Sequence, residues 1–177
     1  MDEKLKLAAD KIEIADVVYK YCRAIDRMDR ELLESVFHAD SIHHHGEYEG
    51  PSSDFCNFAF DILSEMEFTQ HLVGNLLIEV DGDTAWSEAY WTAYHRIAKG
   101  KESDMGFLAE HDSSIDEDVF VSGRYIDRFE RRNGEWKIAK RQGVHDWVRF
   151  EPANEKGQLE AAGPTASRSR QDPAYQR

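Results

Sequence analysis

Hydrophobic residues follow a helical period in the first third of this chain and a two-residue period after it. In residues 10–28 the apolar side chains recur every three or four positions, which predicts an amphipathic helix. Asp10 is expected to cap this helix, with Glu13 completing a capping box. A short helix is predicted at 30–37. A third is predicted from Pro51, where a missing N–H costs least, to about residue 67.

The two-residue period predicts long strands from residue 68 onward. Residues 68–97 form a predicted hairpin that turns at Asp81-Gly82-Asp83. Residues 119–130 and 136–148 form a second, turning near Asn133-Gly134. A short strand and turn are expected within 39–50. Three helices with a short strand among them, followed by four antiparallel strands, predict an α+β fold whose curled sheet makes an open cone with an apolar interior.

The 177 residues suit one domain at 1–150 and a tail at 151–177 that is extended or flexible, because the apolar pattern ends there. Residues 98–118 form a polar, acidic loop whose bulky apolar pair is Phe107 and Leu108. Long loops are often lids, so this pair and Met105 are expected to contact a ligand or a neighbouring subunit. A solvated loop is the equal alternative.

The formal net charge of -13 disfavours nucleic acid and anionic membranes as partners. The N-terminus lacks the apolar core of a signal peptide, and no apolar run is long enough to span a membrane. A cytoplasmic location is therefore expected. Cys22 and Cys56 lie in apolar helical patterns and are expected to be buried free thiols.

The first strand of the 68–97 hairpin carries an ionisable residue where a core strand needs none. Alternation places Leu72, Leu76, Ile78 and Val80 on one face and His71, Val73, Asn75 and Leu77 on the other. The second face is predicted to be the wall of a pocket. Substrate contacts are expected from the following residues: Tyr19, Val73, Asn75, Tyr90, Phe107 and Leu108.

His71 and Asp26 are the predicted catalytic pair, because a neutral imidazole is a good base near pH 7 and a carboxylate fixes its tautomer. Tyr21 would donate a hydrogen bond to a developing oxyanion, and Arg141 would clamp an anionic oxygen. Each has a plainer alternative: Asp26 as a turn former, Tyr21 as a core aromatic, and Arg141 in a surface salt bridge. Ion pairs from Asp26 to Arg23 or Arg30 would instead favour a non-catalytic domain that binds a small molecule.

Metal, hydrolase and nucleotide chemistry have little support in the sequence. His43, His44 and His45 are consecutive, and neighbouring strand residues point to opposite faces, so no metal site is predicted. The chain has no Gly-x-Ser-x-Gly element of a serine hydrolase and no nicotinamide or flavin motif.

Three stretches together resemble the SnoaL-like branch of the nuclear transport factor 2-like superfamily: residues 21–26, residues 68–75, and residues 123–141 with Arg141. That branch includes scytalone dehydratase, lindane dehydrochlorinase and the bile acid 7α-dehydratases. The resemblance implies a cystatin-like roll, a cone of curved antiparallel sheet closed by N-terminal helices. It also implies a His71–Asp26 dyad assisted by Tyr21 and Arg141, and no cofactor. The dehydrochlorinase has a lysine near the position of Tyr21, and this departure argues against halide elimination.

The resulting expectation is a lyase, a dehydratase acting on a hydrophobic cyclic or aromatic substrate. An isomerase or a carbon–carbon lyase, for example one releasing formaldehyde, is the alternative within enzymes. A non-catalytic small-molecule binding domain is the alternative outside them. A homo-oligomer is expected, a trimer by resemblance or else a dimer, with Trp91, Trp147 and Phe150 near the outer face of the sheet.

Overall fold

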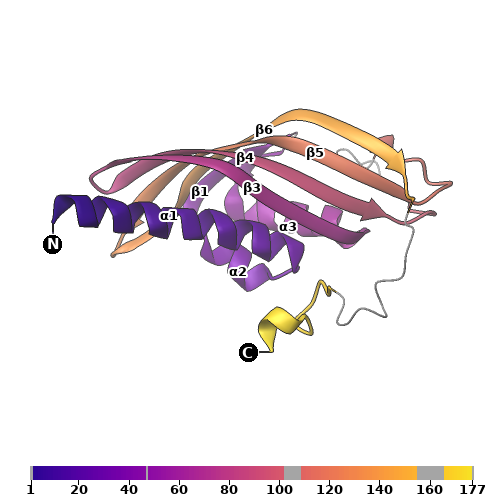
Figure 1. Ribbon diagram of the computed structural model, residues 1–177, viewed down its shortest axis with the longest axis horizontal. Helices are drawn as coiled ribbons and strands as arrows, with labels where there is room; N and C mark the ends of the chain where they lie inside the picture. The colour runs from indigo at the N-terminus through magenta and orange to yellow at the C-terminus, as the bar shows by residue number, and fades with distance from the viewer. Residues whose placement is uncertain (1, 47, 102–108, 155–165, 177) are drawn as a thin grey trace.

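Six strands form one curved, open sheet over three helices in the computed structural model, which describes residues 2–46, 48–101, 109–154 and 166–176 (Figure 1). The expected α+β class is confirmed. The helices are α1 (Glu3–Asp26), α2 (Arg30–Ser35) and α3 (Ser52–Ser64), and a 3₁₀ turn, η3, covers Pro173–Tyr175. The strands are β1 (Phe37–His45), β2 (Tyr48–Pro51), β3 (Met66–Asp81), β4 (Thr84–Ile97), β5 (Glu117–Arg132) and β6 (Glu135–Pro152).

Helix α1 begins earlier than the sequence predicts. Its N-cap is Asp2, which accepts a hydrogen bond from the Lys4 amide, so the prediction of Asp10 as the cap is wrong. The first two turns lack an apolar face, and Leu5 is exposed, which hid them from the periodicity. Asp10 is buried inside the helix, where its carboxylate accepts from Arg131 at 2.6 Å and from the indole N–H of Trp136 at 3.1 Å.

The other two helices lie where they are expected, and each packs below the sheet. Asp29 caps α2 by accepting from the Leu32 amide at 3.2 Å. Pro51 precedes α3, and that helix ends at Ser64, slightly before the predicted end. Cys22 and Cys56 are buried free thiols, as predicted. No helix in the described part of the chain is long and apolar enough to cross a membrane.

Both predicted hairpins are present, and their turns explain why. Gly82 has φ +61°, while Asn133 and Gly134 have φ +54° and +85°, the left-handed conformations that two-residue hairpin turns require. The sheet order is β2-β1-β6-β5-β4-β3. One feature was not predicted: β1 pairs with β6 in parallel, and the other neighbours are antiparallel. This pairing joins the N-terminal third of the chain to its last strand.

A β-bulge in β3 reverses the predicted faces. Between Val73 and Leu76 the pairing with β4 shifts by one residue, so alternation breaks there. His71 and Val73 lie on the helix side before the bulge, and Leu76 and Ile78 lie on that side after it. Leu72 and Leu77 are instead exposed on the outer face, at 65% and 62%. The predicted division of this strand into two faces is therefore wrong beyond the bulge.

Strand β6 carries a similar bulge at Ala139, where its register with β5 shifts. Alternation predicts Ile138 and Arg141 on opposite faces. The extra residue brings both to the interior, and both side chains are fully buried.

Residues 166–176, part of the predicted tail, lie against the helices. The Arg168 guanidinium donates to the Leu63 and Met66 carbonyls, at the end of α3 and the start of β3. The Tyr175 hydroxyl donates to the Asp29 carboxylate at 2.8 Å. Tail composition gave no sign of these contacts. The expected lid residues, Met105, Phe107 and Leu108, lie outside the described residues.

Candidate active site

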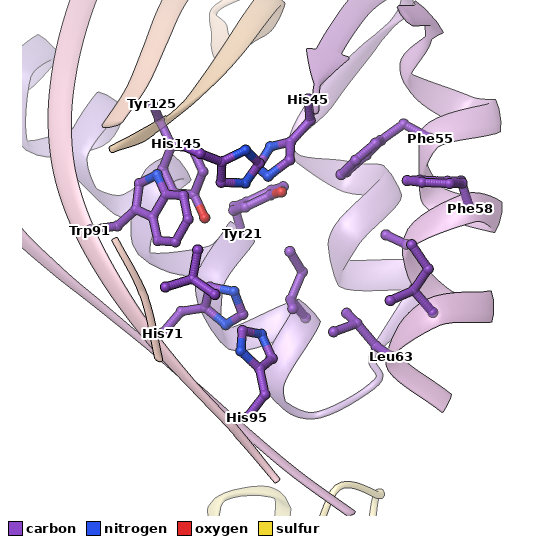
Figure 2. A pocket seen from close by; sticks show the side chains of 14 residues that line it. Tyr21, His45, Phe55, Phe58, Leu63, His71, Trp91, His95, Tyr125 and His145 are labelled. Atoms are coloured by element: carbon purple, nitrogen blue, oxygen red, sulfur yellow. The ribbon is translucent and has the colours of Figure 1, made fainter. Parts of the chain in front are cut away.

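The concave face of the sheet, α1 and α3 enclose a mostly apolar cavity (Figure 2). It offers about 90 Å³ to the centres of water-sized molecules, room for roughly six to nine waters at ~10–15 Å³ each. Helix α3 supplies an apolar wall through Phe55, Phe58 and Leu63. Six polar rings line the remainder: Tyr21, His45, His71, His95, Tyr125 and His145. No Lys, Arg, Asp or Glu is among the described residues that line it.

His71 and Asp26 form a dyad behind one end of this cavity. Asp26 ends α1, and its Oδ1 accepts from Nδ1 of His71 at 2.8 Å. Its Oδ2 accepts from the main-chain N–H of His71 at 2.9 Å. Because the carboxylate accepts the Nδ1 proton, the lone pair of the neutral ring is on Nε2. The carboxylate holds both the ring and the strand that carries it, which a simple turn former would not do.

Arg141 lies behind the cavity rather than in it, so the predicted direct clamp on a bound oxygen is not supported by its position. Its Nε and Nη2 donate to the two oxygens of Asp127 at 2.7 and 2.6 Å, and both side chains are fully buried. The guanidinium lies 3.9 Å from the ring centre of Tyr21 and 4.2 Å from that of Tyr125. The surface salt bridge considered from sequence is also excluded. Arg141 is a buried cation stacked on two tyrosines.

Tyr21 and Tyr125 present their phenols to the cavity from α1 and β5 (Figure 2). Burial raises the pKa of Tyr21, although the charge of Arg141 opposes this, and burial raises the pKa of Tyr125 well above its usual value. Both phenols therefore stay protonated and can donate hydrogen bonds. Tyr125 was missed from sequence, although alternation along β5 places it with buried Val121.

A second histidine adjoins the dyad. The His95 ring lies edge-on to His71 with 5.4 Å between ring centres, and His95 is almost fully buried. Burial lowers the pKa of His95 well below its usual value, so this ring is neutral.

The opposite end of the cavity holds another histidine pair, His45 from β1 and His145 from β6. Their ring centres are 4.7 Å apart in an edge-to-face arrangement. Burial lowers the pKa of His45 to about 3, and burial also lowers the pKa of His145 although Asp146 opposes it. Neither residue was predicted as part of the site. His43, two positions before His45, is fully buried and stacks on Phe55 at 3.4 Å.

Trp91 joins the two ends. Its indole lies 6.3 Å from the His71 ring and 6.2 Å from the His45 ring, centre to centre. The sequence placed Trp91 near the outer face of the sheet, and this is wrong: it is 3% exposed and faces the cavity.

Four residues expected to contact substrate lie elsewhere. Asn75 and Tyr90 are exposed on the outer face of the sheet, so the prediction that they line the pocket is wrong. The bulge turns Asn75 outward, and strict alternation turns Tyr90 away from its buried neighbour Trp91. Tyr19 and Val73 border a second hollow, between α1 and β3, which His71 also lines.

The described residues hold no group of three His, Cys, Asp or Glu side chains placed to bind a metal ion.

Comparison with known proteins identifies the family. The chain matches the SnoaL-like domain over residues 7–142. This match covers most of the chain, and the protein belongs to the SnoaL-like domain family. No curated protein matches it.

Solved structures give the same fold. A hexachlorocyclohexane dehydrochlorinase, LinA type 2, superimposes with a TM-score of 0.70 at 19% identity, covering 88% of this chain and 98% of its own. A proposed scytalone dehydratase from Novosphingobium aromaticivorans gives 0.65 at 19%, covering 85% and 95%. A cystatin-like protein of unknown function from Nostoc punctiforme gives 0.60 at 20%, covering 78% and 92%. At such identities the likeness establishes the fold alone.

Proposed function

We propose that this protein is a lyase, a dehydratase that eliminates water from a hydrophobic cyclic or aromatic substrate with its own side chains. The observation that carries the proposal is the dyad, in which a carboxylate fixes the Nδ1 proton of His71 beside an apolar cavity. Two structural relatives, a dehydrochlorinase and a proposed dehydratase, are described by elimination reactions. Asp26 makes its hydrogen bonds to His71, the arrangement expected of an enzyme rather than of a binding domain.

In the proposed reaction, Nε2 of His71 removes a proton from a carbon made acidic by a neighbouring carbonyl or aromatic system. The electron pair of that C–H bond forms the new double bond, and the C–O bond of the leaving hydroxyl breaks. The imidazolium returns the proton to the departing oxygen, which leaves as water, and the enzyme regains its starting state. Asp26 stabilises the imidazolium through Nδ1.

Tyr21 and Tyr125 are placed to stabilise negative charge that develops on a substrate oxygen. Their phenols are neutral donors in a water-poor cavity, where such hydrogen bonds act strongly. Arg141 stacks on both rings without touching the substrate and pairs with both oxygens of Asp127, so its role is to position the two phenols.

Turnover and proton abstraction can be tested separately. A panel of hydroxylated cyclic ketones and phenolic alcohols is assayed for water loss, and exchange of the acidic C–H is followed in D₂O. His71→Gln is expected to lower both rates by ~10²–10⁴, the usual contribution of a general base. His44→Gln, the same change at a side chain outside the cavity lining, is the matched control.

Near wild-type turnover in a folded His71→Gln variant would refute the mechanism. Isomerisation begins with the same proton abstraction, so product analysis separates it from dehydration: an isomerase returns a product of unchanged mass. A wild-type protein that binds the panel compounds but exchanges no C–H is a binding domain.

A further inference from the structure

The cavity end opposite the dyad is formed by His45 and His145, and the position of the His45 ring depends on the residue across from it. In the parallel pairing of β1 with β6, His45 lies opposite Gly143. A Cβ at position 143 would approach Nδ1 of His45 to 2.3 Å, closer than any real contact. Glycine at 143 therefore permits the His45 ring to occupy its place, and any larger residue would displace it.

This end of the cavity contains polar atoms without partners. Within the described chain, neither Nδ1 of His45 nor Nε1 of Trp91 has a hydrogen-bond partner, and both atoms are buried. A buried polar atom left unpaired destabilises the fold, and such atoms in native proteins need an explanation. A bound molecule that adds oxygen atoms to this end is one explanation.

The charges here disfavour an ionic ligand. The described lining has no Lys or Arg, and the cation behind it, Arg141, lies against Tyr21 and Tyr125 and pairs with both oxygens of Asp127. Burial favours the neutral form of both His45 and His145. A carboxylate or phosphate would lose its hydration without meeting an available cation. An uncharged hydroxyl or carbonyl would lose far less and would meet imidazoles that can donate or accept.

We infer that His45 and His145 bind an uncharged oxygen substituent of the substrate, on the side of its ring remote from the carbon that His71 deprotonates. The ring lies along Trp91, whose indole is about equally far from both histidine pairs. The volume of the cavity fits one ring with a few substituents. The substrate class is therefore a neutral, single-ring compound with oxygen at both ends. This inference rests on the proposed function only for the choice of reacting carbon.

Binding measurements test it without any turnover. Three probes are compared by calorimetry: acetophenone, 4-hydroxyacetophenone, and 4-acetylbenzoate, in which a carboxylate replaces the hydroxyl. Wild-type protein is expected to bind 4-hydroxyacetophenone about tenfold more tightly than acetophenone, the effect of one good hydrogen bond. The carboxylate is expected to bind more weakly than either.

In His145→Leu, the tenfold preference for the hydroxyl is expected to disappear, while the Kd for acetophenone changes little. Gly143→Ala is a second variant that acts on the same site by displacing the His45 ring. His44→Leu, outside the lining, is the matched control and is expected to keep the preference. The His71→Gln variant is also expected to keep it, which separates this inference from the catalytic proposal.

Three results would overturn the inference: no binding of 4-hydroxyacetophenone at millimolar concentration, tighter binding of the carboxylate, or an unchanged preference in both His145→Leu and Gly143→Ala. If the hydroxyl preference follows His145 and yet no lyase activity is found, the binding site stands and the proposed function fails.

Discussion

The two ends of the cavity are built from the same side chain and differ in what stands behind it. At one end His71 donates to the Asp26 carboxylate. At the other, His45 and His145 face each other, and within the described residues neither ring hydrogen-bonds to a carboxylate. A histidine with a carboxylate is held in one tautomer and can accept a proton as a base. A histidine in this apolar surrounding without one stays neutral and is suited to hydrogen bonding. The chemistry of each end therefore depends on whether a carboxylate such as Asp26 lies behind the imidazole, and not on the imidazole alone.

Removing the carboxylate should have the largest effect, because it makes the dyad end resemble the other. In Asp26→Asn the amide can donate to Nδ1 and leave the proton on Nε2, so the base is lost. We expect kcat to fall by ~10²–10⁴, as for loss of the base itself. Asp16→Asn, at an exposed site on the same helix, is the matched control in steady-state assays. A loss of only a few-fold would show that the carboxylate does not set the tautomer.

Removing Arg141, which stacks on both Tyr21 and Tyr125, should have the next largest effect. Arg141→Met leaves the Asp127 carboxylate buried without its partner, which typically costs ~3–5 kcal/mol of unfolding free energy. Urea unfolding measures the loss. Arg132→Met removes an exposed pair with Asp40 and should change stability little. A small loss in Arg141→Met would mean that the pair is not needed for the fold, and the variant could then be assayed for its effect on turnover.

The histidines that lack a carboxylate partner should make the free energy of unfolding fall at acid pH. The pKa of His43 is held well below its usual value by burial, and that of His45 is held at about 3. The unfolded chain therefore binds protons below about pH 6.5 that the native protein does not, and stability falls as the pH drops toward 3. Each such group contributes a slope of at most ~1.4 kcal/mol per pH unit. His43→Phe should flatten the curve between pH 6 and 5, measured by urea unfolding.

His44→Phe is the control for that experiment, because His44 lies on the same strand and is not part of the buried cluster. An identical pH dependence in wild type and His43→Phe would show that His43 is already protonated in the native state.

The outer face should matter least to either end of the cavity. Leu77, Trp86 and Trp147 are exposed there, and we propose that this face forms contacts in a homo-oligomer, a trimer or a dimer. Trp86→Ser with Trp147→Ser should reduce the assembly, measured by light scattering at micromolar concentration. Binding of 4-hydroxyacetophenone should be almost unchanged. A wild-type monomer would reject the oligomer.

Sequence patterns predicted what local periodicity and turn chemistry control. The hairpin turns at Gly82 and Gly134 were identified because those positions need a positive φ. The proximity of His71 to Asp26 came from resemblance together with the odd placement of a histidine on a strand. The bulges at Val73–Leu76 and Ala139 could not be read from the pattern, because an extra residue leaves composition unchanged and reverses every face beyond it.

The second end of the cavity was missed for a different reason. His45 and His145 are 100 positions apart and meet only through the parallel pairing of β1 with β6. No local signal specifies which edge a short strand will choose. The run at positions 43–45 suggests metal binding when it is read alone, whereas the partner of His45 is His145 on the last strand.

The same pairing determines when the cavity can exist during folding. Strand β1 has only its short neighbour β2 until β6 has been synthesised, so its other edge waits for residues 138–143. Contacts so distant in sequence close late, because the entropy of closing the long intervening chain must be overcome first. The hairpins β3–β4 and β5–β6 can form beforehand, with His71 in place. The oxygen-binding end depends on this long-range pairing, so a ligand held at both ends needs β1 already paired with β6.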